Sequence, residues 1–306
     1  PTASPTPTPT PTRSATLRSP GPGTSLAEGG DAITRAAAMS RALFASAPVV
    51  VLAPVDDVPA QLRAASIGAA LGVPTLLTGP DPDAATTTEI DRLGASDVVL
   101  VGGASLGADG SGLRVVVAPD GDDAVLRLTG GSGPAAAVTS VAAGGEPAAV
   151  SALGAGGDTL LEAAVPEAPP AAGPETPAAE PSPAAGLPTS SASPALSSPS
   201  TGSTLLVPTV PASPASAVLV LSDGDLSTLA ALATARAAGA TVVLVPGGDP
   251  RSSSASVRAI AAVDRAGTAV VAVGPAFGSA ADLDWRVATA ATGVELPGGG
   301  QTLFPG

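Results

Sequence analysis

The chain has 306 residues and a formal net charge of −13, and it contains no His, Cys or Tyr. Every basic side chain is Arg, so the sequence also excludes the P-loop and Schiff-base chemistries that need Lys. Without His or Cys there is no ordinary zinc site, no Ser-His-Asp triad and no thiolate nucleophile. The negative charge argues against nucleic acid as a partner, and no apolar run approaches the roughly 20 residues of a membrane span.

Residues 1–23 are predicted to form a Pro/Thr-rich disordered stalk. They begin with PTASPTPTPTPT, a repeat that favours an extended polyproline-like chain with no apolar face to bury. Two interpretations stay open: a stalk with O-glycosylated Thr that holds the folded part away from a surface, or a plain disordered tail. Because the chain starts at Pro1 and not at Met, we expect that a signal peptide has already been removed.

Residues 24–165 are predicted to form a first α/β unit. It opens with an Ala-rich helix within 24–47 that turns Ile33, Ala37, Leu43 and Phe44 toward the core. Two helical stretches then alternate with three apolar runs, which are Val49–Leu52, Val73–Leu77 and Val98–Val101. In the first of these helices Ala70 and Leu71 follow Ile67 at three- and four-residue steps, and Leu62 adds a further apolar position. This alternation predicts a Rossmann-like βαβαβ unit with a parallel sheet covered by helices.

The rest of the first unit shows weaker patterns. Residues 113–118 (LRVVVA) indicate a further strand. Residues 124–128 and 134–161 predict one strand and one or two short helices between them.

The composition changes at about residue 166. Residues 166–215 are rich in Pro, Ala, Ser and Thr and predict a long disordered linker, in which 204–210 (TLLVPTV) form a brief strand or docking segment. Residues 216–306 are predicted to form a second α/β repeat unit, because 217–275 align with the first unit at few gaps. In that alignment Val218–Leu221 matches the first strand, Gly239 matches Gly72, and Thr268–Val273 matches the third strand. A helix over Ala280–Thr292 follows.

The first unit also contains motifs in a characteristic order. They are TRAAAMSRALF (34–44), VVVLA (49–53), DVPAQL (57–62), PTLLT (74–78) and LGASDVVLVGG (93–103). In these motifs the chain resembles the cell wall-binding repeat of type 2, which occurs in surface proteins of Gram-positive bacteria. We expect an actinobacterial source. The second unit resembles that family more weakly, with TVVL (241–244) in place of PTLL, and Ala60 stands where the family usually carries an acidic residue.

The resemblance implies non-catalytic attachment to anionic secondary polymers of the cell wall, such as a teichoic-type polymer, at an extracytoplasmic location. It implies no cofactor and no metal, and it places Pro74, Thr75, Leu76 and Leu77 near the binding surface. The family usually packs three repeats around a pseudo-threefold axis, so a third unit has either decayed into 119–165 or lies outside this chain. Since an anionic polymer should be held by Arg, we expect Arg63 and Arg92 to contribute.

The alternative function is a Mg²⁺-dependent hydrolase or phosphotransferase. Pairs of Asp follow predicted strands at Asp81/Asp83, Asp120/Asp122 and Asp223/Asp225, and this edge of a parallel sheet is where α/β enzymes hold Mg²⁺. The best pair for that role is Asp223 with Asp225, but Asp225 also fits a helix N-cap. A further possibility is a structural remnant of a larger surface protein, in which the two units only pack on each other.

Two turns after strands resemble other functional motifs. Gly103-Ala104-Ser105-Leu106-Gly107 matches a nucleophile elbow, yet no His exists to activate the serine, so the sequence favours a strand-to-helix turn. The glycines in VGGAS and VPGGDP suit either backbone contacts to a phosphate or tight turns, and tight turns are the commoner use. We therefore expect the protein not to be an enzyme.

Overall fold

The computed structural model describes residues 14–80, 83–106, 112–129, 137–157, 159–164, 217–263 and 267–292. The sequence-based predictions for most of the stalk, for the linker with its 204–210 segment and for the last residues lie outside these ranges. None of the described helices combines the length and the apolar character that crossing a membrane requires.

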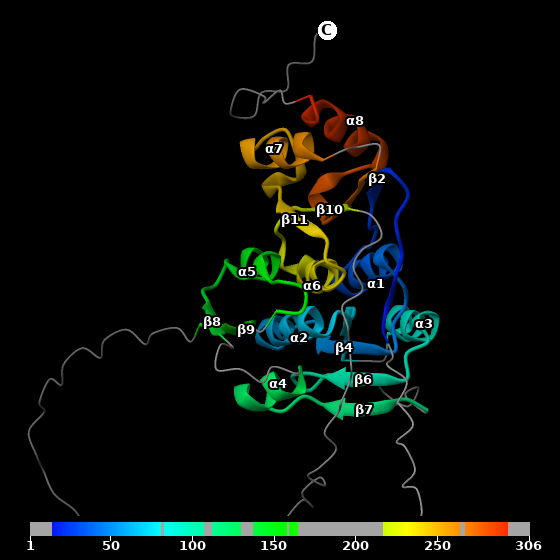
Figure 1. The fold of residues 1–306 in the computed structure, drawn as a ribbon, viewed down its shortest axis with the longest axis vertical. Coiled ribbons are helices and arrows are strands. Elements are labelled where there is room, and N and C mark those ends of the chain that lie inside the picture. Colours follow the sequence, from blue (N-terminus) through cyan, green and yellow to red (C-terminus); the bar gives the residue numbers. More distant parts are fainter. Residues whose placement is uncertain are drawn as a thin grey trace, which may run out of the picture. The chain divides into compact units, whose positions relative to one another are not determined.

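The first unit contains a four-stranded parallel sheet in the order β5-β4-β6-β7 (Figure 1). Its elements are β4 (Val49–Pro54), α2 (Val58–Leu71), β5 (Thr75–Thr78), α3 (Ala84–Leu93), β6 (Asp97–Leu100), β7 (Arg114–Val117) and α4 (Asp122–Leu128). The predicted βαβαβ unit is therefore confirmed, and so is the further strand. The strands are short and apolar because both faces of the central strands are buried under helices.

Local signals set the bounds of α2 and α3. The side chains of Asp57 and Asp83 cap their N-termini by accepting hydrogen bonds from the amides of Ala60 (2.9 Å) and Ala85 (2.7 Å). The helices end at Gly72 and Gly94, which adopt the left-handed conformation with φ of 64° each.

The second unit repeats this arrangement in a parallel sheet of order β11-β10-β12-β2. Its elements after the linker are β10 (Val218–Ser222), η2 (Leu226–Thr228), α6 (Leu229–Ala237), β11 (Thr241–Leu244), η3 (Pro246–Gly248), α7 (Ser254–Ala262), β12 (Ala269–Val273), η4 (Pro275–Phe277) and α8 (Ala280–Ala290). The α/β class of both predicted units is thus confirmed. Gly239, the predicted counterpart of Gly72, also has a positive φ, of 74°.

The fourth strand of this second sheet comes from the N-terminal part of the chain. Strand β2 (Gly23–Leu26) runs parallel to β12, with Gly23 opposite Ala269 and Leu26 opposite Ala272 (Figure 1). The domain boundaries predicted from sequence placed residue 23 in the stalk and 24–26 in the first unit, whereas their hydrogen bonds belong to the second sheet. The chain then returns through α1 (Ala32–Leu43) to β3 (Phe44–Ser46), which pairs antiparallel with β1 (Thr16–Leu17).

A small βαβ element follows the first sheet. It consists of β8 (Ala137–Val141), α5 (Glu146–Ala152) and β9 (Thr159–Ala163), and its two strands are parallel. The weak pattern had predicted one strand here, and the structure has two. The element is held to α2 by the hydroxyl of Ser66, which accepts a hydrogen bond of 2.8 Å from the amide of Leu161.

The two sheets share one hydrophobic core through α1, α2 and α6. Buried alanines of α6, among them Ala231 and Ala235, belong to the same cluster as Val50 of β4 and Val220 of β10. The hydroxyl of Thr234 on α6 accepts from the amide of Thr75 and donates to its carbonyl, both at 3.0 Å. Because β5 is an edge strand, this contact satisfies backbone groups that would otherwise be buried without partners.

Candidate functional site

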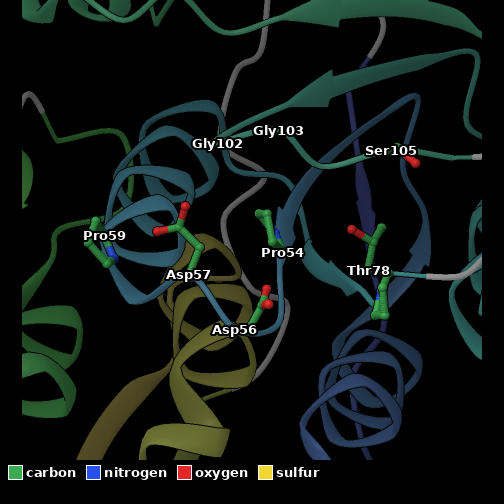
Figure 2. Close-up of a pocket in the computed structure, with 10 residues that line it drawn as sticks. Pro54, Asp56, Asp57, Pro59, Thr78, Gly102, Gly103 and Ser105 are labelled. Atoms are coloured by element: carbon green, nitrogen blue, oxygen red, sulfur yellow. The ribbon is translucent and has the colours of Figure 1, made fainter.

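The candidate site is a crevice at the carboxyl edge of the first sheet, with a volume of about 530 Å³ (Figure 2). That volume lies within the range of small-molecule sites in proteins. The residues that line the crevice are Pro54, Asp56, Asp57, Pro59, Thr78, Gly79, Pro80, Gly102, Gly103 and Ser105.

The topology of the sheet produces the crevice. Strand β4 lies between β5 and β6, so the chain leaves β4 toward one neighbour and later returns to the other. Loops therefore diverge at the carboxyl end of β4, which is where ligands bind in open α/β sheets. In Figure 2 the carboxylate of Asp57 points toward the Gly102–Gly103 turn, while Thr78 and Ser105 lie on the other side of Pro54.

The two carboxylates in the crevice have different local roles. One oxygen of Asp57 caps α2 through the amide of Ala60, and the other lies on the side of Gly102. Asp56 is exposed, and no hydrogen bond of its side chain is found among the described residues. Asp57 is thus held in place by the helix, while Asp56 is available to a ligand.

The floor of the crevice depends on the turn after β6. Gly102 and Gly103 have φ angles of 60° and 79°, a region that favours glycine. A Cβ on Gly102 would overlap the Cβ of Ala60, whereas one on Gly103 would meet open space. The prediction of a tight turn is confirmed, and the contact shows that this turn passes close to the start of α2 at Ala60.

The chemistry of the lining favours hydrogen-bond donors over anions. The crevice presents the carboxylates of Asp56 and Asp57, the hydroxyls of Thr78 and Ser105, and glycine and proline backbone. Among the described residues, none of those that line it is basic. Carboxylates accept hydrogen bonds from hydroxyl and amine groups and repel phosphate or carboxylate groups.

Arg63, predicted as a polymer ligand, is instead occupied by contacts within the protein. Its guanidinium pairs with the carboxylates of Asp122 (2.6 Å) and Glu162 (3.1 Å). It also donates to the carbonyls of Pro119 and Asp120, at 3.3 and 2.6 Å. Arg63 therefore ties α2 to the start of α4 and to β9, away from the crevice.

Arg92 is neutralised in the same way. Its Nη2 and Nε atoms donate to both oxygens of the buried Glu89 carboxylate, at 2.6 and 2.9 Å, and Nη2 also donates to the carbonyl of Phe44 at 3.0 Å. These hydrogen bonds to the Glu89 carboxylate raise the pKa of Arg92 above its ordinary value. Arg41 pairs with the same carboxylate at 3.1 Å.

The segment Pro74–Leu77 is buried and does not form a surface. Thr75, Leu76 and Leu77 lie in β5 between α6 and the neighbouring strand β4, with exposed fractions of 0–1%. Only Thr78, the next residue, reaches the crevice. Sequence reasoning did not propose Asp56 or Thr78 as site residues. Asp56 follows the end of β4 and Thr78 ends β5. Their positions at the carboxyl ends of neighbouring predicted strands are the signal that could have found them.

Asp223 and Asp225, the predicted alternative metal ligands, serve the backbone of the second unit. Asp225 caps η2 by accepting from the amide of Ser227 at 2.8 Å, and the hydrogen bonds from the Ser227 hydroxyl and amide lower the pKa of Asp225. Asp223 accepts from the amides of Asp225 (3.2 Å) and Ala276 (2.9 Å). The N-cap interpretation of Asp225 is confirmed. In the part of the chain that the structure describes, no group of three or more acidic residues is arranged to hold a metal ion.

Comparisons with known proteins include a distant structural likeness. No protein family matches the chain by its sequence profile, and no curated protein matches it significantly. Among solved structures, Cwp6 from Clostridium difficile is similar with a TM-score of 0.49 and 13% sequence identity over 86% of this chain. The chain spans about half of that structure, since the match covers 48% of it. The resemblance of residues 34–103 to type 2 cell wall-binding repeats therefore stays a prediction.

Proposed function

We propose that this protein is a non-catalytic, extracytoplasmic module that attaches to a cell-wall glycan polymer through the crevice beside β4. The strongest support is that four motifs of the resemblance begin or end at residues that line the crevice. VVVLA leads into Pro54, DVPAQL opens with Asp57, PTLLT closes with Thr78, and LGASDVVLVGG closes with Gly102 and Gly103. Four motifs that are separated along the sequence thus meet around one crevice.

The lining refines which part of the polymer is bound. An anionic polymer was expected from the resemblance, but the expected cations Arg63 and Arg92 are paired with carboxylates elsewhere. The crevice itself carries Asp56 and Asp57. It therefore suits the hydroxyl or amino groups of sugar residues, and the anionic groups of such a polymer would remain in solvent.

The same residues support binding without catalysis. Ser105 lies at the crevice in a segment that matches the nucleophile-elbow motif, but the chain contains no His that could act as its base. The next described element after β6 is also strand β7 and not the predicted helix. Asp57 is committed to capping α2.

The test is retention of the full chain on purified Gram-positive cell walls, before and after mild acid removes the secondary polymers. Ser105→Phe, which fills the crevice from an exposed position, should strongly weaken retention, and Asp56→Asn should weaken it less. Asp91→Asn, an exposed and charge-matched change on α3, should have no effect. Retention that is unchanged in Ser105→Phe, or that falls equally in all three variants, would contradict the proposal.

A further inference from the structure

Trp285 is the largest exposed apolar side chain of the described residues, and its exposed fraction is 61%. It is also the only Trp in a chain whose aromatic content is 1%. By contrast, Phe44 and Phe277 are fully buried. Burying a large apolar side chain stabilises a protein by about 1.5–3 kcal/mol. Because Trp285 is mostly exposed, its side chain does not make this contribution to the stability of the fold.

A fixed guanidinium lies against one face of the indole ring. The Arg251 Cζ atom is 4.6 Å from the ring centroid, within the range of a cation–π contact. Asp249 holds that guanidinium from the side, because Arg251 Nε and Nη2 donate to its two carboxylate oxygens at 2.9 and 2.7 Å. These bonds lower the pKa of Asp249 and raise the pKa of Arg251. The pair is therefore rigid and close to neutral.

The cluster of Asp249, Arg251 and Trp285 lies beyond the carboxyl edge of the second sheet. Asp249 and Arg251 follow β11, and Trp285 lies on α8, which follows β12 through η4. At this edge η4 occupies the end of β10, since the amide of Ala276 donates to Asp223. A ligand of the second unit must consequently bind on the surface rather than beside the central strand.

We propose that Trp285 and Arg251 form a second carbohydrate subsite, which takes an uncharged pyranose ring of a cell-wall glycan. The apolar CH face of the sugar packs on the indole face opposite Arg251. Arg251 lies on the other face of the ring and holds the indole in place through the cation–π contact. This inference rests on the proposed function for the glycan as its ligand, but it concerns different residues and a different unit.

The charges around the cluster favour a neutral sugar over an anionic group. The guanidinium of Arg251 is matched by Asp249, and Arg286 is turned inward to the carbonyls of Gly248 and Phe277. Helix α8 also carries Asp282 close to the cluster. A phosphate or carboxylate would therefore meet one guanidinium that is already paired with Asp249 and one whose hydrogen-bond donors are turned inward.

The test uses the fluorescence of the full chain, because Trp285 is the only Trp and there is no Tyr. Chitotetraose serves as the neutral probe and polyphosphate as the anionic probe. We expect saturable quenching by chitotetraose alone. Calorimetry should show roughly tenfold weaker binding for Trp285→Leu, the loss that truncating an aromatic anchor typically causes. Arg251→Gln should also weaken binding, while the exposed, charge-matched control Arg258→Gln should not.

The possible outcomes separate this inference from the proposed function. Unchanged emission, together with normal retention on cell walls, would overturn the subsite and leave the crevice standing. Quenching by chitotetraose without retention on cell walls would overturn the proposed function of the crevice and leave the subsite standing. Quenching by polyphosphate alone, or emission that depends only on protein concentration, would also overturn the inference, because an anion or a second copy would then be the occupant. Quenching that persists in Ser105→Phe would support a subsite independent of the crevice.

Discussion

Replacing Gly102 by Ala tests whether the turn after β6 and the start of α2 together form the crevice. Two costs are expected at this position. The φ of 60° is unfavourable for a residue with a Cβ, by about 1–2 kcal/mol. The new methyl group also overlaps the Cβ of Ala60, and such overpacking costs about 1–3 kcal/mol. The free energy of unfolding should therefore fall by about 2–5 kcal/mol.

Gly103 provides a matched control for the same turn. Its φ of 79° imposes the same backbone cost, but a Cβ there meets no atom within 4 Å. Gly103→Ala should therefore lower the free energy of unfolding by only about 1–2 kcal/mol. Combining Gly102→Ala with Ala60→Gly should restore most of the difference, apart from the cost of glycine in a helix, which is about 1 kcal/mol.

The assay is urea unfolding followed by far-UV circular dichroism, which reports on the whole chain. A change in midpoint at constant slope measures the change in stability. If Gly102→Ala and Gly103→Ala are equally destabilising, or if Ala60→Gly brings no recovery, the close approach of the turn to α2 is refuted.

Three further predictions concern buried and paired polar groups. Glu89→Gln should cost about 3 kcal/mol in urea unfolding, because the fully buried carboxylate would no longer neutralise the two guanidinium groups that it pairs; an unchanged midpoint would contradict this. Thr234→Val should cost about 1–3 kcal/mol by leaving the backbone of Thr75 unpaired, whereas Thr234→Ser, which keeps the hydroxyl, should cost less than half as much. Asp249 has a pKa below its ordinary value of 3.8 in the folded state, because Arg251 donates to it. Its stabilising contribution is present above 3.8 and is lost as the pH falls through the lower, folded-state pKa. Asp249→Asn should therefore flatten the loss of thermal stability at acid pH, and an acid profile identical to that of the unmodified protein would refute the effect.

Local residue patterns determined much of the fold. The runs at 49–52 and 218–221 became central strands because β-branched apolar residues favour strands that are buried on both faces. Asp57, Asp83 and Asp225 became caps because a short acidic side chain reaches the free amides of a first turn. These signals act over a few residues, so they can be read without knowing the rest of the molecule.

The candidate site was only partly predictable. The sequence pointed to the unit that contains the crevice, but it placed binding on Pro74–Leu77, Arg63 and Arg92. The sequence of an apolar strand that contains Thr does not show whether the edge of that strand is open or covered. The edge of β5 is covered by α6, which lies about 160 positions away in the chain. The sequence likewise does not show whether an Arg is free or paired with a carboxylate. The partners of Arg63 lie on α4 and β9, which are distant in the sequence.

The sequence by itself therefore determined the α/β class, the repeat, the caps and the glycine turns, since each follows from the conformational preferences of neighbouring residues. Only the tertiary structure decided that β2 completes the second sheet, that α6 seals β5, and that the ends of three strands leave a crevice lined by carboxylates. These features depend on which distant segments bury their apolar surface together. That outcome is set by the packing of the whole chain and not by any stretch of it.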